Sequence, residues 1–193
     1  MVTIIDYGAG NIKSVLNAMK YFKINAKITS SVEEIECAEK LILPGVGSFG
    51  FMMYNLRMKK LDRGIVNFIE SGRPFLGICL GMQALFEGSE ESPDVIGLSI
   101  FKGKVVRFSD GKIPQIGWNS VIKSNKDSFE SGFFYFANSF YVVPVEQSII
   151  SSKSFYNEEF VSGVSWKNIT AVQFHPEKSG SNGLNFLSRW LKC

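Results

Sequence analysis

The chain has 193 residues, of which 45% are hydrophobic and 20% charged, and its formal net charge is +3. This length and composition favour one globular domain, residues 1–193, with a sizeable buried core. Lys and Arg are scattered and no apolar run approaches the roughly 18 residues of a membrane span, so we expect neither a nucleic-acid-binding face nor a membrane segment.

The first half of the chain alternates β-branched runs with segments of helical spacing. Continuous apolar strands between amphipathic helices are typical of a parallel sheet that is covered on both faces. The expected strands are residues 2–5, 26–29, 40–43 and 74–79. The expected helices are residues 12–22, one or two within 49–71 with Gly64 as the place for a break, and 82–87.

The second half has a different pattern. Residues 98–174 contain many short β-rich runs, such as 104–108 and 133–136, and turn sequences such as Asp110-Gly111 separate them. This pattern predicts antiparallel strands added to the parallel sheet. The chain closes with an amphipathic helix near residues 183–191.

The cysteines and the first residues favour a cytoplasmic protein. Cys37, Cys79 and Cys193 are odd in number and far apart, without a CxxC pair, so we expect neither a disulfide framework nor a cysteine-based metal site. The N-terminus lacks the basic and apolar regions of a signal peptide. Residues 8–10 lack the third glycine of a dinucleotide-binding loop and no acidic ribose ligand follows at the right distance, so we expect no nucleotide there. We also expect no other cofactor and no metal.

Cys79 lies in Gly77-Ile78-Cys79-Leu80-Gly81, between an apolar strand and a predicted helix. Glycines on both sides of a nucleophile allow the sharp turn of a nucleophile elbow, which would place the sulfur at the carboxyl end of the sheet. The helix N-terminus would favour the thiolate, and the N–H of Leu80 could bind an oxyanion. The alternative is a buried structural cysteine, a common fate of free cysteine.

His175 is the only histidine in the chain, and it lies in Phe174-His175-Pro176-Glu177. Pro176 disfavours the helical region for His175, and in an extended segment residues two apart face the same way. Glu177 could therefore orient the imidazole in a Cys-His-Glu triad. A lone histidine is more often a core or surface residue, but its occurrence together with the cysteine elbow favours the triad.

Residues 43–48 end a predicted strand with two glycines before a helix, in Pro44-Gly45-Val46-Gly47-Ser48. Such a loop can turn backbone N–H groups toward a negative charge, which suits an oxyanion hole beside Cys79. An ordinary strand-to-helix turn is the alternative, and it is the better interpretation of this segment taken alone.

Together these motifs resemble those of the class I, triad-type glutamine amidotransferases, nearly from end to end. Within the class, the Pro-Gly-Val-Gly and Gly-Trp-Asn segments are most similar to the glutaminase subunits of imidazole glycerol phosphate synthases, which serve histidine biosynthesis. The segments that carry the resemblance are residues 6–11, 44–49, 77–83, 117–119, 134–136 and 173–179.

The resemblance implies an α/β, doubly wound, flavodoxin-like three-layer sheet and the hydrolysis of L-glutamine. It assigns Cys79 as the nucleophile, His175 as the general acid and base, and Glu177 as the residue that orients His175. The oxyanion would be bound by backbone groups of Val46, Gly47 and Leu80.

The resemblance also implies a substrate pocket and a partner. The partner would be a (β/α)-barrel cyclase or synthase subunit, which forms a heterodimer with this chain and receives the ammonia. The residues that match substrate-binding positions are Gln83, Glu91, Asn138, Ser139 and Phe140. The residues that match the docking face are Asn11, Trp118, Tyr135 and Lys178, although core packing is the alternative role for Trp118 and Tyr135.

Two positions depart from the family pattern, because Gln115 and Asn138 stand where histidines are usual. Neither belongs to the triad, so glutaminase chemistry is unaffected, but the ammonia acceptor is left open. One alternative is a paralogous subunit that feeds another acceptor, such as a sugar-modifying synthase. A second alternative is a stand-alone cysteine amidase or peptidase. A third is a non-catalytic subunit, and the complete triad motifs argue against this third alternative.

Overall fold

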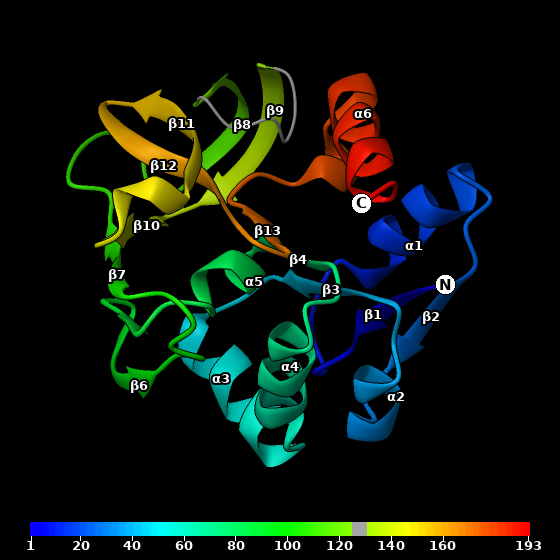
Figure 1. Ribbon diagram of the computed structural model, residues 1–193. Coiled ribbons are helices and arrows are strands. Elements are labelled where there is room, and N and C mark those ends of the chain that lie inside the picture. The colour runs from blue at the N-terminus through cyan, green and yellow to red at the C-terminus, as the bar shows by residue number, and fades with distance from the viewer. Residues whose placement is uncertain (125–130) are drawn as a thin grey trace.

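In the computed structural model, which describes residues 1–124 and 131–193, a mixed sheet runs through the middle of the molecule (Figure 1). Its parallel part has the strand order β2-β1-β3-β4-β13. This order matches that of a doubly wound, flavodoxin-like sheet, so the predicted fold class is confirmed. The strands are β1 (Val2–Ile5), β2 (Ala26–Thr29), β3 (Lys40–Gly45), β4 (Phe75–Cys79) and β13 (Ile169–Val172).

Helices cover both faces of the parallel strands and give three layers (Figure 1). On one face lie α1 (Ile12–Tyr21) and α6 (Gly180–Trp190), and on the other lie α2 (Val32–Glu36), α3 (Phe49–Met58) and α4 (Leu61–Glu70). Strands β1 and β4 are buried along their whole length, which explains their continuous apolar runs. No helix among the described residues is long and apolar enough to cross a membrane.

The predicted antiparallel extension is also confirmed. β12 (Glu158–Trp166) pairs antiparallel with β13, and the sheet continues through β10, β7, β5 and β6. β11 connects β12 to β8, and β8 pairs with β9. These strands are β5 (Gly88–Ser89), β6 (Ser92–Ile96), β7 (Gly103–Arg107), β8 (Gln115–Lys123), β9 (Gly132–Asn138), β10 (Phe140–Pro144) and β11 (Ile150–Tyr156). Two 3-10 turns accompany them, η1 (Gln147–Ile149) and η2 (Pro176–Lys178).

Two details of the predicted helices are wrong. The helix expected over residues 82–87 is instead α5 (Leu80–Gln83), because the N–H groups of Leu85 and Phe86 bond three residues back and tighten the chain. The break expected near Gly64 lies at Lys60, which has a left-handed φ of 59°. Gly64 lies within α4, where an added Cβ would be 3.1 Å from Val32 Cγ1, so its small size serves packing against α2.

Candidate active site

A pocket of about 310 Å³ lies where β3 and β4 end. Ligand sites in open α/β sheets occupy this carboxyl edge. The pocket gathers residues that come from distant parts of the chain and that the sequence predicts to act together. They are Val46, Gly47, Cys79, Leu80, Gln83, Glu91, Asn138, Ser139, Phe140, His175 and Lys178.

Cys79 occupies a sharp turn between β4 and α5, with φ 54° and ψ −110°. This conformation is strained for a residue with a side chain, and such strain is typical of functional turns. A Cβ on Gly81 would collide with the carbonyl oxygen of Leu43 in β3. The glycine after the cysteine therefore lets the elbow pack directly against the neighbouring strand.

The helix after Cys79 is shorter than the sequence predicts. α5 is a single turn that begins at Leu80, so it aligns few peptide dipoles toward the cysteine. Its first N–H groups are nevertheless free of intrahelical partners, as they are at every helix start. The N–H of Leu80 thus remains a suitable oxyanion donor, while the expected effect of a full helix dipole is smaller.

His175 and Glu177 lie in direct contact. Nδ1 of His175 is 2.9 Å from Oε1 of Glu177, and both side chains are almost wholly buried. The backbone N–H of His175 donates to the carbonyl oxygen of Tyr135 at 2.8 Å, which fixes the residue against β9. His175 is extended as predicted, but residues 176–178 form the turn η2, and this turn brings Glu177 back to the ring.

The protonation of His175 follows from its neighbours. Burial disfavours the imidazolium, but the charge and hydrogen bond of Cys79, followed by those of Glu177, raise the pKa of His175 from 6.5 to about 10. The imidazolium is therefore the favoured form of His175 at neutral pH, and beside the sulfur of Cys79 it can act as a proton donor.

Glu177 has a second neighbour besides His175. Oε1 of Glu177 also accepts a hydrogen bond from Nδ2 of Asn11 at 3.4 Å. Oε2 is buried and has no hydrogen-bond partner among the described residues. Asn11, which the resemblance assigns to the docking face, is thus connected directly to the predicted triad.

The predicted oxyanion segment lies beside Cys79, but one of its donors points elsewhere. The N–H of Val46 donates to the hydroxyl of Tyr7 at 3.2 Å. Gly47 is exposed, with a φ of 95°, and an added Cβ would meet no atom within 4 Å. The segment is therefore close enough to the pocket for its predicted role, with the Val46 N–H held away from it.

Three of the predicted substrate-binding residues are joined by hydrogen bonds, and the other two bond to neighbouring segments. The amide nitrogens of Gln83 and Asn138 both donate to the carbonyl oxygen of Phe140, at 3.1 and 2.9 Å. Oε2 of Glu91 accepts from the N–H of Phe49 at 2.6 Å and so ties the start of α3 to the pocket. Ser139 accepts a hydrogen bond from Phe108 through its carbonyl oxygen.

Three of the four residues predicted for the docking face are linked by contacts. The rings of Trp118 and Tyr135 meet edge to face with centroids 6.4 Å apart, and Nζ of Lys178 lies 5.6 Å from the Tyr135 ring centroid. Trp118 is 57% exposed, so the alternative of core packing is wrong for this residue. Asn11 bonds instead to Glu177 of the predicted triad, and Lys178 follows Glu177 in the chain.

The two departures from the family pattern turn out to be neighbours. Gln115 and Asn138 are directly paired between β8 and β9, and both are buried. Oε1 of Gln115 and Oδ1 of Asn138 have no hydrogen-bond partner among the described residues. The two departures from the family pattern therefore lie side by side, at one position of the β8–β9 pairing beside the pocket.

Two residues at the site belong to segments that carry the resemblance, but the sequence prediction assigns them no role. Nε2 of Gln173 donates to Sγ of Cys79 at 3.4 Å, and Oε1 of Gln173 accepts from Gln83 at 3.0 Å. Tyr7, at the end of β1, contacts Val46. The available signal is position: Gln173 is a polar residue two before His175 in an apolar run, and Tyr7 follows a buried strand.

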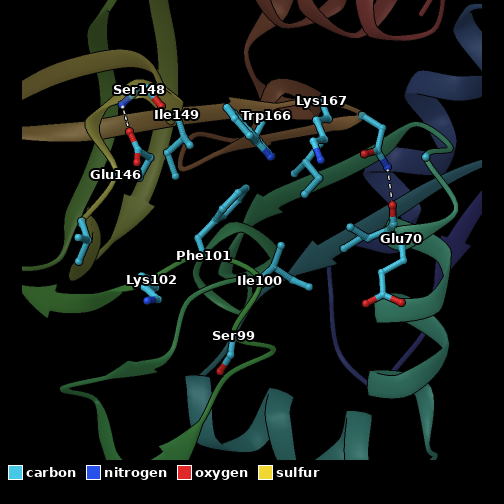
Figure 2. Close-up of a pocket in the computed structure, with 15 residues that line it drawn as sticks. Glu70, Ser99, Ile100, Phe101, Lys102, Glu146, Ser148, Ile149, Trp166 and Lys167 are labelled. Atoms are coloured by element: carbon cyan, nitrogen blue, oxygen red, sulfur yellow. Dashed lines mark hydrogen bonds between the residues drawn. The ribbon is translucent and has the colours of Figure 1, made fainter.

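A larger pocket of about 780 Å³ lies at the opposite, amino end of the parallel strands (Figure 2). Its lining includes the aromatic residues Phe101 and Trp166 and the cationic residues Lys102 and Lys167, which Figure 2 labels. Neither cysteine nor histidine lines it, so it lacks the nucleophile that the smaller pocket has.

Comparisons with known proteins agree with the geometry. Residues 3–192 match the family described as Glutamine amidotransferase class-I. The imidazole glycerol phosphate synthase subunit HisH of Pyrococcus furiosus is 49% identical over 96% of this chain and 95% of that protein. The corresponding HisH subunit of Methanocaldococcus jannaschii is 45% identical over 100% of this chain and 99% of that protein.

Solved structures support the fold. A crystal structure of a glutamine amidotransferase has a TM-score of 0.80 at 19% identity and covers 98% of this chain and 99% of its own. A chain of PurLQS from Thermotoga maritima also has a TM-score of 0.80, at 20% identity, and covers 99% of this chain and 97% of its own. The full-length sequence matches go further than the fold: the chain belongs to the class I glutamine amidotransferases, among the HisH glutaminase subunits of imidazole glycerol phosphate synthase.

Proposed function

We propose that Cys79, His175 and Glu177 hydrolyse L-glutamine to glutamate and ammonia, and that the ammonia passes to a synthase subunit in histidine biosynthesis. The observation that carries this proposal is the buried His175–Glu177 contact of 2.9 Å beside a cysteine on a strained elbow. A nucleophile, a base and a group that orients the base are the elements of covalent amide hydrolysis.

In the first half-reaction, the Cys79 thiolate attacks the carboxamide carbon of glutamine, and the carbonyl oxygen becomes an oxyanion. With Nδ1 of His175 held by Glu177, the other ring nitrogen is free to give its proton to the amide nitrogen. The carbon–nitrogen bond then breaks, ammonia leaves, and a γ-glutamyl thioester remains on Cys79.

In the second half-reaction, water attacks the thioester carbon. Neutral His175 takes a proton from this water, and the carbon–sulfur bond breaks to release glutamate. The imidazolium and thiolate are thereby restored. Leu80 and the 46–47 segment would bind the oxyanion in both halves, and Gln83, Glu91 and residues 138–140 would hold the amino-acid part of the substrate.

The partner in this proposal is a (β/α)-barrel synthase subunit, bound as a heterodimer over the glutamine pocket in the cytoplasm. The contacts of Tyr135 with Trp118 and Lys178, and the bond of Asn11 to Glu177, support this docking face. The full-length HisH relatives favour the histidine-pathway acceptor over the paralogue that Gln115 and Asn138 left open.

A glutamine analogue that carries a diazo-ketone tests the chemistry. Cys37 and Cys193 are exposed whereas Cys79 is buried, so simple thiol accessibility favours the other two cysteines. We expect peptide mass spectrometry to find the label on Cys79, with loss of glutaminase activity, and no label or activity in Cys79→Ala. Labelling of Cys37 or Cys193 with activity retained in Cys79→Ala would overturn the proposal.

A further inference from the structure

The sulfur of Cys79 has a hydrogen-bond donor that the mechanism described above does not use. Gln173 is the first residue after β13, and its Nε2 donates to Sγ of Cys79 at 3.4 Å. The register of the sheet explains this contact, because Val172 pairs with Ile78 and the next residues of the two parallel strands are therefore neighbours. The Gln173 side chain is wholly buried, so this bond lies out of contact with solvent.

A backbone acceptor sets the direction of the Gln173 amide. The carbonyl oxygen of Phe140 can only accept hydrogen bonds, so the amide of Gln83 turns its nitrogen toward this oxygen, at 3.1 Å. The same nitrogen carries two hydrogens and also donates to Oε1 of Gln173 at 3.0 Å. Because the oxygen of Gln173 is held in this way, its nitrogen is the end that faces the Cys79 sulfur.

We propose that Gln173 is a further catalytic residue, which donates an N–H to the Cys79 sulfur and so stabilises the negative charge that this sulfur carries during the reaction. The proposal rests on the glutaminase function proposed above and deepens it by one residue. The bond from Gln83 keeps the Gln173 amide in the donating direction.

In the proposed reaction the sulfur carries negative charge before it attacks and again when it leaves. In the thioester it is uncharged, and it becomes a thiolate once more when the carbon–sulfur bond breaks and the electron pair stays on sulfur. Hydrogen bonds to charged acceptors are about twice as strong as bonds between neutral groups, so the Gln173 N–H favours the thiolate over the thioester. Loss of this N–H should therefore slow the step that releases glutamate.

Two substitutions that keep the length of the side chain test the role of this N–H. Gln173→Met fills similar space without an amide, and we expect it to lower the kcat of glutamine hydrolysis, measured with the synthase subunit present, by about tenfold or more. Gln173→Glu is closer in shape and keeps an oxygen that accepts from Gln83, but at mildly alkaline pH it places a second, charged oxygen against the sulfur. It should therefore lower kcat further than Gln173→Met, whereas a residue that only filled space or supported Gln83 would tolerate glutamate better.

Ser162→Ala is the matched control, because it removes another buried hydrogen-bonding group next to β13. The hydroxyl of Ser162 bonds to the hydroxyl of Ser152 at 3.0 Å. The backbone oxygen of Ser162 accepts from the N–H of Gln173, and alanine keeps this bond. We expect kcat to be unchanged in Ser162→Ala, and thermal unfolding checks that all three variants are folded.

Acid quenching of reactions with radiolabelled glutamine measures the fraction of the chain that carries the γ-glutamyl thioester. We expect a larger fraction in Gln173→Met than in the unchanged chain, because departure of the thiolate is slowed, whereas a misplaced sulfur would attack more slowly and form less thioester. An unchanged kcat, a lowered kcat without a rise in thioester, or a Gln173→Glu variant more active than Gln173→Met would overturn the proposal. If no form of the chain hydrolyses glutamine or forms the thioester, the glutaminase function itself is wrong.

Discussion

At the scale of single residues, the predicted chemistry depends on the buried contact between the His175 imidazolium and the Glu177 carboxylate. The chain has a single histidine, and its imidazolium is stabilised by Cys79 and Glu177 against the cost of burial. Sequence reasoning identified these three residues because a nucleophile elbow and a His-Pro-Glu segment have recognisable spacing. It did not identify Tyr7 or Gln173, because their roles depend on contacts between segments 39 and 94 residues apart.

Substitutions in the predicted triad should differ in severity. His175→Asn removes the only histidine in the chain and with it the proposed general acid and base, so we expect glutamine kcat to fall by at least about a thousandfold with a small change in KM. Glu177→Gln keeps a hydrogen-bonding group and removes only its charge, so its loss of kcat should be smaller. Steady-state kinetics of the two variants checks this order, and a more damaging Glu177→Gln would contradict the assigned roles.

The raised pKa of His175 predicts a pH dependence. Its folded-state pKa of about 10 lies above the ordinary 6.5, so its stabilising effect is complete below pH 6.5 and is lost as the pH rises through 10. The proton donor for ammonia is lost over the same range, so kcat/KM should decline on the alkaline side near pH 10. In Glu177→Gln this decline should move to lower pH, and an unmoved profile would mean that Glu177 does not stabilise the imidazolium.

At the scale of elements, the parallel core was predictable from the residue pattern and its strand order from the family resemblance, whereas the ends of several elements were not. Continuous apolar runs identify β1, β3 and β4 because burial on both faces requires them. The length of α5 depends on how the elbow packs against β3, and the helix break at Lys60 depends on backbone conformation that composition does not reveal. Likewise, η2 rather than an extended segment brings Glu177 to His175, a tertiary effect that Pro176 alone does not specify.

The packing of the elbow leads to a stability prediction. In Gly81→Ala the new methyl group would collide with the β3 backbone, which cannot move aside as a side chain can, so the free energy of unfolding should fall by about 1–3 kcal/mol. Gly88→Ala is the control, because its Cβ would lie 3.5 Å from the carbonyl oxygen of Val95, an ordinary contact. Urea unfolding measures both, and equal effects would show that the close approach at Gly81 is unimportant.

At the scale of the whole molecule, the surface that the resemblance assigns to docking is continuous with the predicted triad. Asn11 bonds to Glu177, and Lys178 follows Glu177 in η2 and lies over Tyr135. Which residues form this surface could be predicted only through the family resemblance, because they come from four separate segments that the fold brings together. A partner bound on this surface would be in a position to affect Glu177 directly.

Charge reversal at this surface tests the docking face. Lys178→Glu should weaken the binding of the synthase subunit, because a partner group that faces the cation would then meet a like charge. Lys192→Glu, just beyond the carboxyl end of α6, makes the same charge change elsewhere and should leave binding unchanged. Titration calorimetry with both variants provides the comparison, and equal affinities would remove Lys178 from the interface.

The central claim is that this chain is a glutaminase that its synthase partner activates. The direct measurement is glutamine turnover by the chain alone, and by the chain mixed with the imidazole glycerol phosphate synthase barrel from the same cell and its ribonucleotide substrate. One recruited oxyanion donor accounts for about a hundredfold or more in rate, so we expect at least that increase, together with glutamine-dependent formation of the synthase product. Full turnover by the isolated chain, or no complex and no product with the barrel, would contradict the claim.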